Sequence, residues 1–172
     1  IYEKFKSALV DKAKKLIVGD PKSSNSHLGA VVSEEHMNKI LLKINEAKKL
    51  GGILLCGGER LMLEGEFKNG YYIKPTVFEN LAYDCSINNE EIFGPVVTLI
   101  PFESEDDVIM MANSSEFGLS ASIFTKDISR AHRVINQLQA GICWINSWGD
   151  SPAEMPVGGY KESGIGRENG PE

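Results

Sequence analysis

The chain has 172 residues, 42% of them hydrophobic and 24% charged, and 18 basic against 24 acidic side chains give a formal net charge of -6. A chain of this length buries roughly 70% of the surface that its unfolded form exposes, which excludes disorder and small disulfide-stapled scaffolds. The acidic balance argues against nucleic acid or an anionic membrane as main partner, and no apolar run approaches the ~20 residues of a membrane span. We expect a cytoplasmic protein that binds a small molecule or another protein.

The first residues of the chain carry apolar side chains at helical spacing. Phe5, Leu9 and Ala13 share one face of a helix expected over residues 1–18, which the Gly-Asp-Pro at 19–21 ends. The first residue, Ile1, already belongs to this pattern, which favours a start inside a longer protein. Ser33 has the spacing of a helix N-cap, so a second helix is expected from there to the glycines at 51–52.

The rest of the chain alternates short apolar runs with helical segments. Strands are expected over residues 53–56, 71–78 with an interruption at Pro75, 96–102, 120–124 and 142–145, and helices over 104–113 and 127–139. Strand–helix–strand units at this spacing predict an α/β fold with a mainly parallel, helix-covered sheet. The last twenty residues are rich in glycine and proline and are expected to form a loop, the kind of segment on which sites are often built.

The cysteines and histidines carry no metal or disulfide pattern. Cys56, Cys85 and Cys143 stand far apart without a CxxC pair, so a disulfide framework or a zinc site is not expected. The ordinary interpretation of each cysteine is a small buried hydrophobe. The three histidines also lack the spacing of metal ligands.

Two carboxylates and an aromatic ring stand at the entrance of the strongest predicted strand, in the segment EEIFGPV at 90–96. An acidic surface turn is the ordinary interpretation, because acidic pairs are usually solvated. In the functional interpretation, a carboxylate accepts both hydroxyls of a sugar diol and Phe93 offers a flat face to a heteroaromatic ring. The glycine-rich tail at 156–168 matches neither GxGxxG after a strand nor GxxxxGK[ST], so it is not expected to hold phosphates.

Taken together, these segments resemble the aldehyde dehydrogenase superfamily. The resemblance rests on EEIFGPV at 90–96, NSSEFGLS at 113–120, GICWIN at 141–146 and PVGGYKESGIGRE at 156–168, and it runs from end to end of the chain. Residues 140–156 are most similar to the bacterial members that oxidise betaine aldehyde. The resemblance implies that residues 1–172 are the C-terminal part of the catalytic domain.

Members of this family add a cysteine thiolate to an aldehyde, transfer hydride to NAD or NADP, and release the acid with water activated by a glutamate. The resemblance places that cysteine, that glutamate and the nucleotide-binding domain upstream of Ile1, so none of the three cysteines present is the nucleophile. It implies a parent enzyme that makes glycine betaine from betaine aldehyde, and a fragment that is inactive alone. Another aminoaldehyde or trimethylaminobutyraldehyde as substrate, or a non-catalytic folded module, are the alternatives.

Several site residues follow from the same resemblance. Glu91 matches the glutamate that binds the nicotinamide-ribose hydroxyls, and Phe93 the aromatic residue beside the nicotinamide. Glu168 matches a buried glutamate assigned to a charge or proton relay. Lys161 and Gly164 match positions whose main-chain carbonyls help hold a potassium ion between subunits, which also implies a homo-oligomeric parent, a dimer or a tetramer.

The implied substrate carries a trimethylammonium group, which donates no hydrogen bonds and must be recognised by aromatic faces and dispersion. Trp148 is the first candidate for such a face, and Trp144 and Tyr160 are the next candidates. The apolar strand around Trp144 favours a place in the core for that ring. Cys143 corresponds to a cysteine near the substrate pocket of relatives, with simple packing as the alternative.

Overall fold

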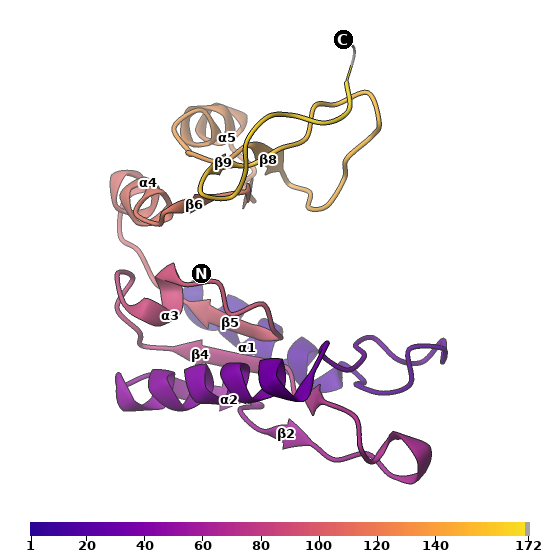
Figure 1. Ribbon diagram of the computed structural model, residues 1–172. Coiled ribbons are helices and arrows are strands. Elements are labelled where there is room, and N and C mark those ends of the chain that lie inside the picture. Colours follow the sequence, from indigo (N-terminus) through magenta and orange to yellow (C-terminus); the bar gives the residue numbers. More distant parts are fainter. Residues whose placement is uncertain (171–172) are drawn as a thin grey trace. The chain divides into compact units, whose positions relative to one another are not determined.

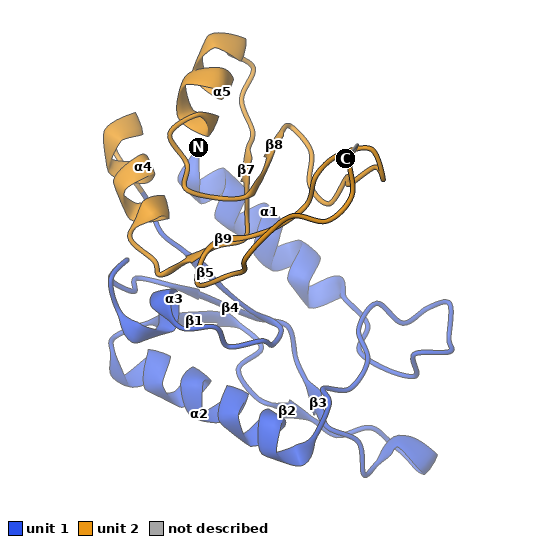
Figure 2. Ribbon diagram, turned by 45° about the horizontal axis from the view of Figure 1, so that its top comes forward, with its two compact units in different colours: residues 1–101 blue, residues 102–172 orange. Residues whose placement is uncertain are grey.

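The computed structural model describes residues 1–170 and divides the chain into two compact units, unit 1 from Ile1 to Pro101 and unit 2 from Phe102 onward (Figure 2). No helix within residues 1–170 is both long and apolar enough to cross a bilayer. Each unit combines helices with short strands, and each contains one parallel strand pair. The α/β class expected from the sequence is confirmed.

Unit 1 is built on a three-stranded sheet with the order β1-β4-β5, whose strands are labelled in Figure 2. β4 and β5 run parallel, with Thr76 opposite Val96, whereas β1 pairs antiparallel with β4. A separate antiparallel pair joins β2 to β3. The elements in chain order are α1 (Tyr2–Lys15), α2 (Glu34–Lys49), β1 (Ile53–Cys56), β2 (Arg60–Leu61), the 3-10 turn η1 (Gly65–Phe67), β3 (Tyr72–Ile73), β4 (Thr76–Glu79), α3 (Ser86–Asn89) and β5 (Val96–Leu99).

The two long helices lie on opposite faces of this sheet (Figures 1 and 2). Side chains alternate along a strand, so neighbouring residues of β4 serve different faces. Phe78 is fully buried in the cluster formed with Ile40 and Ile44 of α2, whereas Val77 faces a pocket on the α1 side. The core of unit 1 therefore lies between α2 and the sheet, and none of the side chains of α1 is fully buried.

Unit 2 pairs β7 (Ser120–Ile123) in parallel with β8 (Ile142–Ile145), and α5 (Ile128–Ile135) packs on both strands. β6 (Phe117–Gly118) pairs antiparallel with β9 (Tyr160–Lys161), which brings the glycine-rich tail back onto the unit. α4 (Glu105–Asn113) is tied to α5 by ion pairs from Glu105 to Arg130 and Arg133.

Element boundaries differ from the sequence expectation where proline or a cap intervenes. The expected strand at 71–78 divides at Pro75 into β3 and β4, which belong to different sheets, because proline has no N–H for a ladder. The expected strand at 96–102 ends at Leu99, shortly before Pro101. The expected helix at 127–139 is shorter, since Asp127 is its N-cap and Asn136 its C-cap.

Candidate functional site

The turn at residues 90–95, which leads into β5, carries two carboxylates in different surroundings. Glu90 forms a 2.6 Å ion pair with Lys43 of α2, so this carboxylate is used structurally. Glu91 is exposed, and within residues 1–170 it enters no salt bridge. Glu90 is therefore ion-paired, whereas the exposed Glu91 carboxylate fits both the ordinary interpretation of a solvated acidic turn and the functional one of a free acceptor.

Phe93 is held in a backbone conformation that aromatic residues rarely adopt. Its φ is 54°, in the left-handed region, which costs a bulky residue on the order of 1–3 kcal/mol. The side chain is 76% exposed, so burial of the ring does not offset this cost. The Phe93 carbonyl lies 2.8 Å from Nε2 of His36, and the two rings meet edge to face with centroids 6.3 Å apart.

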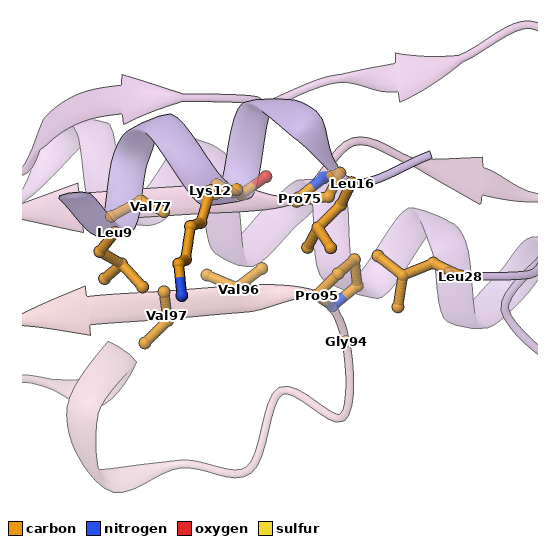
Figure 3. A pocket seen from close by; sticks show the side chains of 12 residues that line it. Leu9, Lys12, Leu16, Leu28, Pro75, Val77, Gly94, Pro95, Val96 and Val97 are labelled. Atoms are coloured by element: carbon orange, nitrogen blue, oxygen red, sulfur yellow. The ribbon is translucent and has the colours of Figure 1, made fainter. Parts of the chain in front are cut away.

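The residues after Phe93 seat the turn against the core and against a pocket. A Cβ on Gly94 would lie 2.6 Å from Cδ1 of the buried Ile40, so only glycine fits without displacement. The Pro95 carbonyl accepts from Thr76 N at 2.8 Å, which fixes the start of β5 beside β4. Figure 3 shows the pocket of about 340 Å³ beside this turn, lined by aliphatic residues of α1, β4 and β5 with Lys12 as the charged residue of the lining.

In unit 2, β8 carries Cys143 and Trp144 and ends in a loop that exposes a second tryptophan. Trp148 is 75% exposed, and its ring lies 6.3 Å from that of Trp144 at an angle of 52°. Trp144 is half-buried and donates its indole N–H to the Asp150 carbonyl at 2.6 Å. Trp144 is thus only partly a core residue, and it supports the exposed ring of Trp148.

Tyr160 and Cys143 have surroundings that differ from those of the exposed Trp148. One face of the Tyr160 ring is covered by the Arg167 guanidinium, 4.9 Å from the ring centroid. Cys143 is half-buried, and burial raises the pKa of its thiol, as it does for Cys56. A raised pKa keeps a thiol protonated at neutral pH and makes it a poor nucleophile.

The tail packs through close backbone contacts. A Cβ on Gly141, at the start of β8, would collide with the Gly158 carbonyl, so these two segments approach as only glycine allows. Val157 and Glu168 exchange two backbone hydrogen bonds of 2.7 and 2.8 Å, which close the tail into a loop. The glycines of this segment therefore serve chain packing.

Lys161, Gly164 and Glu168 lie on this loop. The Lys161 ammonium donates to the carbonyls of Asn113 and Ser115, each at 2.8 Å, while the Lys161 backbone adopts a φ of 53°. Gly164 is exposed. The Glu168 side chain is also exposed, in contrast to the buried glutamate that it matches.

Backbone strain marks two of the residues singled out from sequence. Five residues other than glycine have positive φ within residues 1–170; three are asparagines, which tolerate the left-handed region, and the others are Phe93 and Lys161. Strained conformations of this kind cluster at functional sites. Glu91 and Phe93 belong to unit 1, and Cys143, Trp148, Lys161, Gly164 and Glu168 belong to unit 2.

Two contributions to these sites were missed by the sequence analysis. His36 was considered from the sequence only as a metal ligand, yet its ring contacts Phe93 across 57 positions of sequence. Asn146, with a φ of 54°, exchanges two 2.9 Å hydrogen bonds with the backbone of Thr125 and thereby fixes the loop that carries Trp148. Asn146 ends the segment GICWIN, but nothing in that segment indicates its hydrogen bonds to Thr125. In the part of the chain that the structure describes, no group of three His, Cys, Asp or Glu side chains could hold a metal ion.

Comparison with known proteins decides the family. The family model described as "Aldehyde dehydrogenase family" matches residues 1–172. The chain belongs to the aldehyde dehydrogenase family. The resemblance carried by the four sequence segments, and the fold expected from it, are confirmed.

Solved structures of aldehyde dehydrogenases superpose closely on this chain. Betaine aldehyde dehydrogenase from Staphylococcus aureus in complex with NAD+ is 43% identical with a TM-score of 0.92, over 98% of this chain and 33% of that chain. A double mutant of the same enzyme gives 43% identity and a TM-score of 0.93 over 99% and 34%. The NAD+ complex of aldehyde dehydrogenase from Bacillus cereus is 44% identical with a TM-score of 0.92 over 98% and 33%. This chain therefore spans about a third of the length of these enzymes.

Proposed function

We propose that the protein to which this chain belongs oxidises betaine aldehyde to glycine betaine with NAD(P). The observation that carries the proposal is the 43% identity to Staphylococcus aureus betaine aldehyde dehydrogenase over 98% of the chain. The Bacillus cereus relative, at 44% identity, is named only as an aldehyde dehydrogenase. That equal similarity favours a second candidate, a related aldehyde such as another aminoaldehyde or trimethylaminobutyraldehyde.

The turn at residues 90–95 suits a nicotinamide nucleotide. Glu91 and Phe93 are both exposed, so the Glu91 carboxylate would accept hydrogen bonds from the two hydroxyls of a ribose diol and the Phe93 ring would offer an apolar face to a heteroaromatic ring. When bound, NAD(P) accepts the hydride. Glu91 and Phe93 orient the nicotinamide ribose and ring, because a rigid, pre-formed geometry is what a site contributes to such a transfer.

The loop after β8 suits a quaternary ammonium substrate. Trp148 presents an exposed ring, steadied by Trp144, and such a face attracts a cation that cannot donate hydrogen bonds. Cys143, on the same strand, is proposed near the substrate pocket, with simple packing as the alternative. Burial raises the pKa of its thiol, so this cysteine is not proposed as the nucleophile.

We propose for the tail residues the roles that the matching positions have in the family. The Lys161 ammonium is occupied by the carbonyls of Asn113 and Ser115, so a potassium ion near this loop would meet main-chain oxygens of Lys161 and Gly164. Glu168 is proposed as a relay carboxylate, a role that requires cover from the rest of a homo-oligomeric parent because its side chain is exposed here. Residues 1–172 form the C-terminal part of the catalytic domain in this proposal.

The test is a comparison of substrates on the complete parent enzyme. The value of kcat/KM is measured for betaine aldehyde, trimethylaminobutyraldehyde, an uncharged analogue of an aminoaldehyde and a simple aliphatic aldehyde. We expect betaine aldehyde to lead. A wide preference for aliphatic aldehydes would refute the substrate assignment, and a lead by trimethylaminobutyraldehyde would establish the second candidate.

Two controls separate the remaining proposals. A Cys143→Ser variant should keep most of the activity, whereas loss of all turnover would show that the nucleophile lies within this chain. Exchange of potassium for sodium at equal ionic strength should lower the Tm of the parent. An unchanged Tm would argue against a structural potassium ion.

A further inference from the structure

Phe93 needs a restraint from outside its own turn. Its left-handed backbone is unfavourable for an aromatic residue, and its ring is 76% exposed, so neither local preference nor burial keeps it in place. A residue in this position would otherwise relax to a different φ, and the ring would move with it.

The restraint comes from the first turn of α2. His36 Nε2 lies 2.8 Å from the Phe93 carbonyl, and the His36 ring meets the Phe93 ring at 66° with centroids 6.3 Å apart. The His36 backbone N–H is itself bound by the N-cap Ser33 Oγ at 3.1 Å. The imidazole is therefore mounted on the capped end of a helix whose next turn, through Met37 and Ile40, is buried in the core.

The direction of this hydrogen bond is fixed by chemistry. A carbonyl oxygen only accepts, so Nε2 of His36 must carry the hydrogen. Both the neutral Nε2–H tautomer and the imidazolium carry that hydrogen. Glutamine, whose amide nitrogen also donates, is the conservative replacement, and alanine removes the donor.

We propose that His36 is a positioning residue that holds the Phe93 carbonyl, and through it the ring, in the conformation that receives the nicotinamide. This inference rests on the proposed function for the role of Phe93, while the contact itself does not depend on a bound cofactor. Loss of the donor releases the left-handed backbone at Phe93 and lets Phe93 and Glu91 sample other orientations.

The experiment compares His36→Ala, His36→Gln and a matched His132→Ala in the complete parent enzyme. His132 is an exposed histidine of α5 in unit 2, so its replacement controls for loss of an imidazole as such. Hydrogen exchange of the peptide covering residues 90–96 is followed by mass spectrometry without cofactor, and hydride transfer is followed in a single turnover with saturating NAD(P).

His36→Ala should speed exchange at residues 90–96 and slow hydride transfer about 5-fold to 10-fold, the factor that corresponds to one lost hydrogen bond. His36→Gln should restore much of both, and His132→Ala should change neither. Unchanged exchange in His36→Ala, or faster exchange with an unchanged hydride-transfer rate, would each overturn the positioning role. If the wild-type parent reduces no NAD(P) with any aldehyde, the proposed function fails, whereas the exchange measurement still tests the contact between His36 and Phe93.

Discussion

Gly94→Ala probes how tightly the candidate cofactor turn is seated on the core of unit 1. The added methyl group would lie 2.6 Å from Cδ1 of Ile40 and 3.0 Å from its Cγ1, and the Ile40 side chain is fully buried. Overpacking of this kind typically costs about 1–3 kcal/mol. Because the φ of Gly94 lies outside the left-handed region, alanine also gains about 0.4–1 kcal/mol from the restricted unfolded chain. The net expectation is a loss of about 1–2 kcal/mol.

Ile40→Val supplies the second arm of a double-mutant cycle. It removes Cδ1, the atom closest to the new methyl group, at a typical cost of about 0.5–1.5 kcal/mol. The double variant should therefore be more stable than the sum of the two single losses, by about 1 kcal/mol, as expected for residues in contact.

The assay must report on unit 1 by itself. Both tryptophans of the chain, Trp144 and Trp148, belong to unit 2, so their fluorescence does not follow this region. Native-state hydrogen exchange of peptides from α2 and β4 gives the opening free energy where the change is made. A neutral Gly94→Ala, or losses that add within about 0.3–0.5 kcal/mol in the double variant, would refute the close contact between Gly94 and Ile40.

Three further outcomes are expected. In the parent enzyme, Glu91→Gln should lower the single-turnover hydride-transfer rate while leaving NAD(P) binding measurable by titration; an unchanged rate would remove Glu91 from that role. Arg133 and then Arg130 hold the pKa of Glu105 down, from 4.5 to about 2, so the stability that this carboxylate gives to unit 2 is present above pH 4.5 and is lost as the pH falls through about 2. Glu105→Gln should remove that part of the pH dependence in tryptophan-monitored unfolding, and an identical acid profile would contradict it. Trp148→Ala should raise KM for betaine aldehyde about 3-fold to 30-fold, by the usual strength of a cation–π contact, and leave KM for an uncharged aldehyde nearly unchanged; equal changes for both substrates would argue against a cation face.

Local signals predicted the four longer helices α1, α2, α4 and α5, because the residues that cap and pattern a helix lie close together in the sequence, but the four-residue α3 was missed. Ser33 caps α2 through His36 N, and Ser104 forms a full capping box with Asp107 at the start of α4. The short strands β2, β6 and β9 were missed, since two-residue ladders are created by long-range pairing and leave no periodic pattern. The antiparallel strand pairs that accompany the two parallel pairs also depend on contacts between residues far apart in the sequence.

The features of the candidate site also divide into those that a local sequence pattern predicts and those that depend on contacts with distant residues. Glu91 and Phe93 were predicted from the segment EEIFGPV and from the family resemblance, and their cofactor roles stay predictions. The contact between His36 and Phe93 was invisible because nothing in either segment requires it; it depends on where α2 places its first turn. The exposure of Glu168 was equally beyond the sequence, because burial is a property of the surrounding chain.

A glycine-rich composition is typical of phosphate-binding loops, but in this tail it allows close packing of the backbone. Backbone approach to a phosphate and backbone approach to a neighbouring strand both require that no Cβ intervene. In this chain the close approach is between Gly141 and the Gly158 carbonyl, at the start of β8, the strand that carries Cys143 and Trp144. The tail is held on the other side by the Lys161 ammonium at Asn113 and Ser115. These two attachments fix the loop that carries Lys161 and Gly164, so Gly141 and Gly158 serve chain packing in this segment.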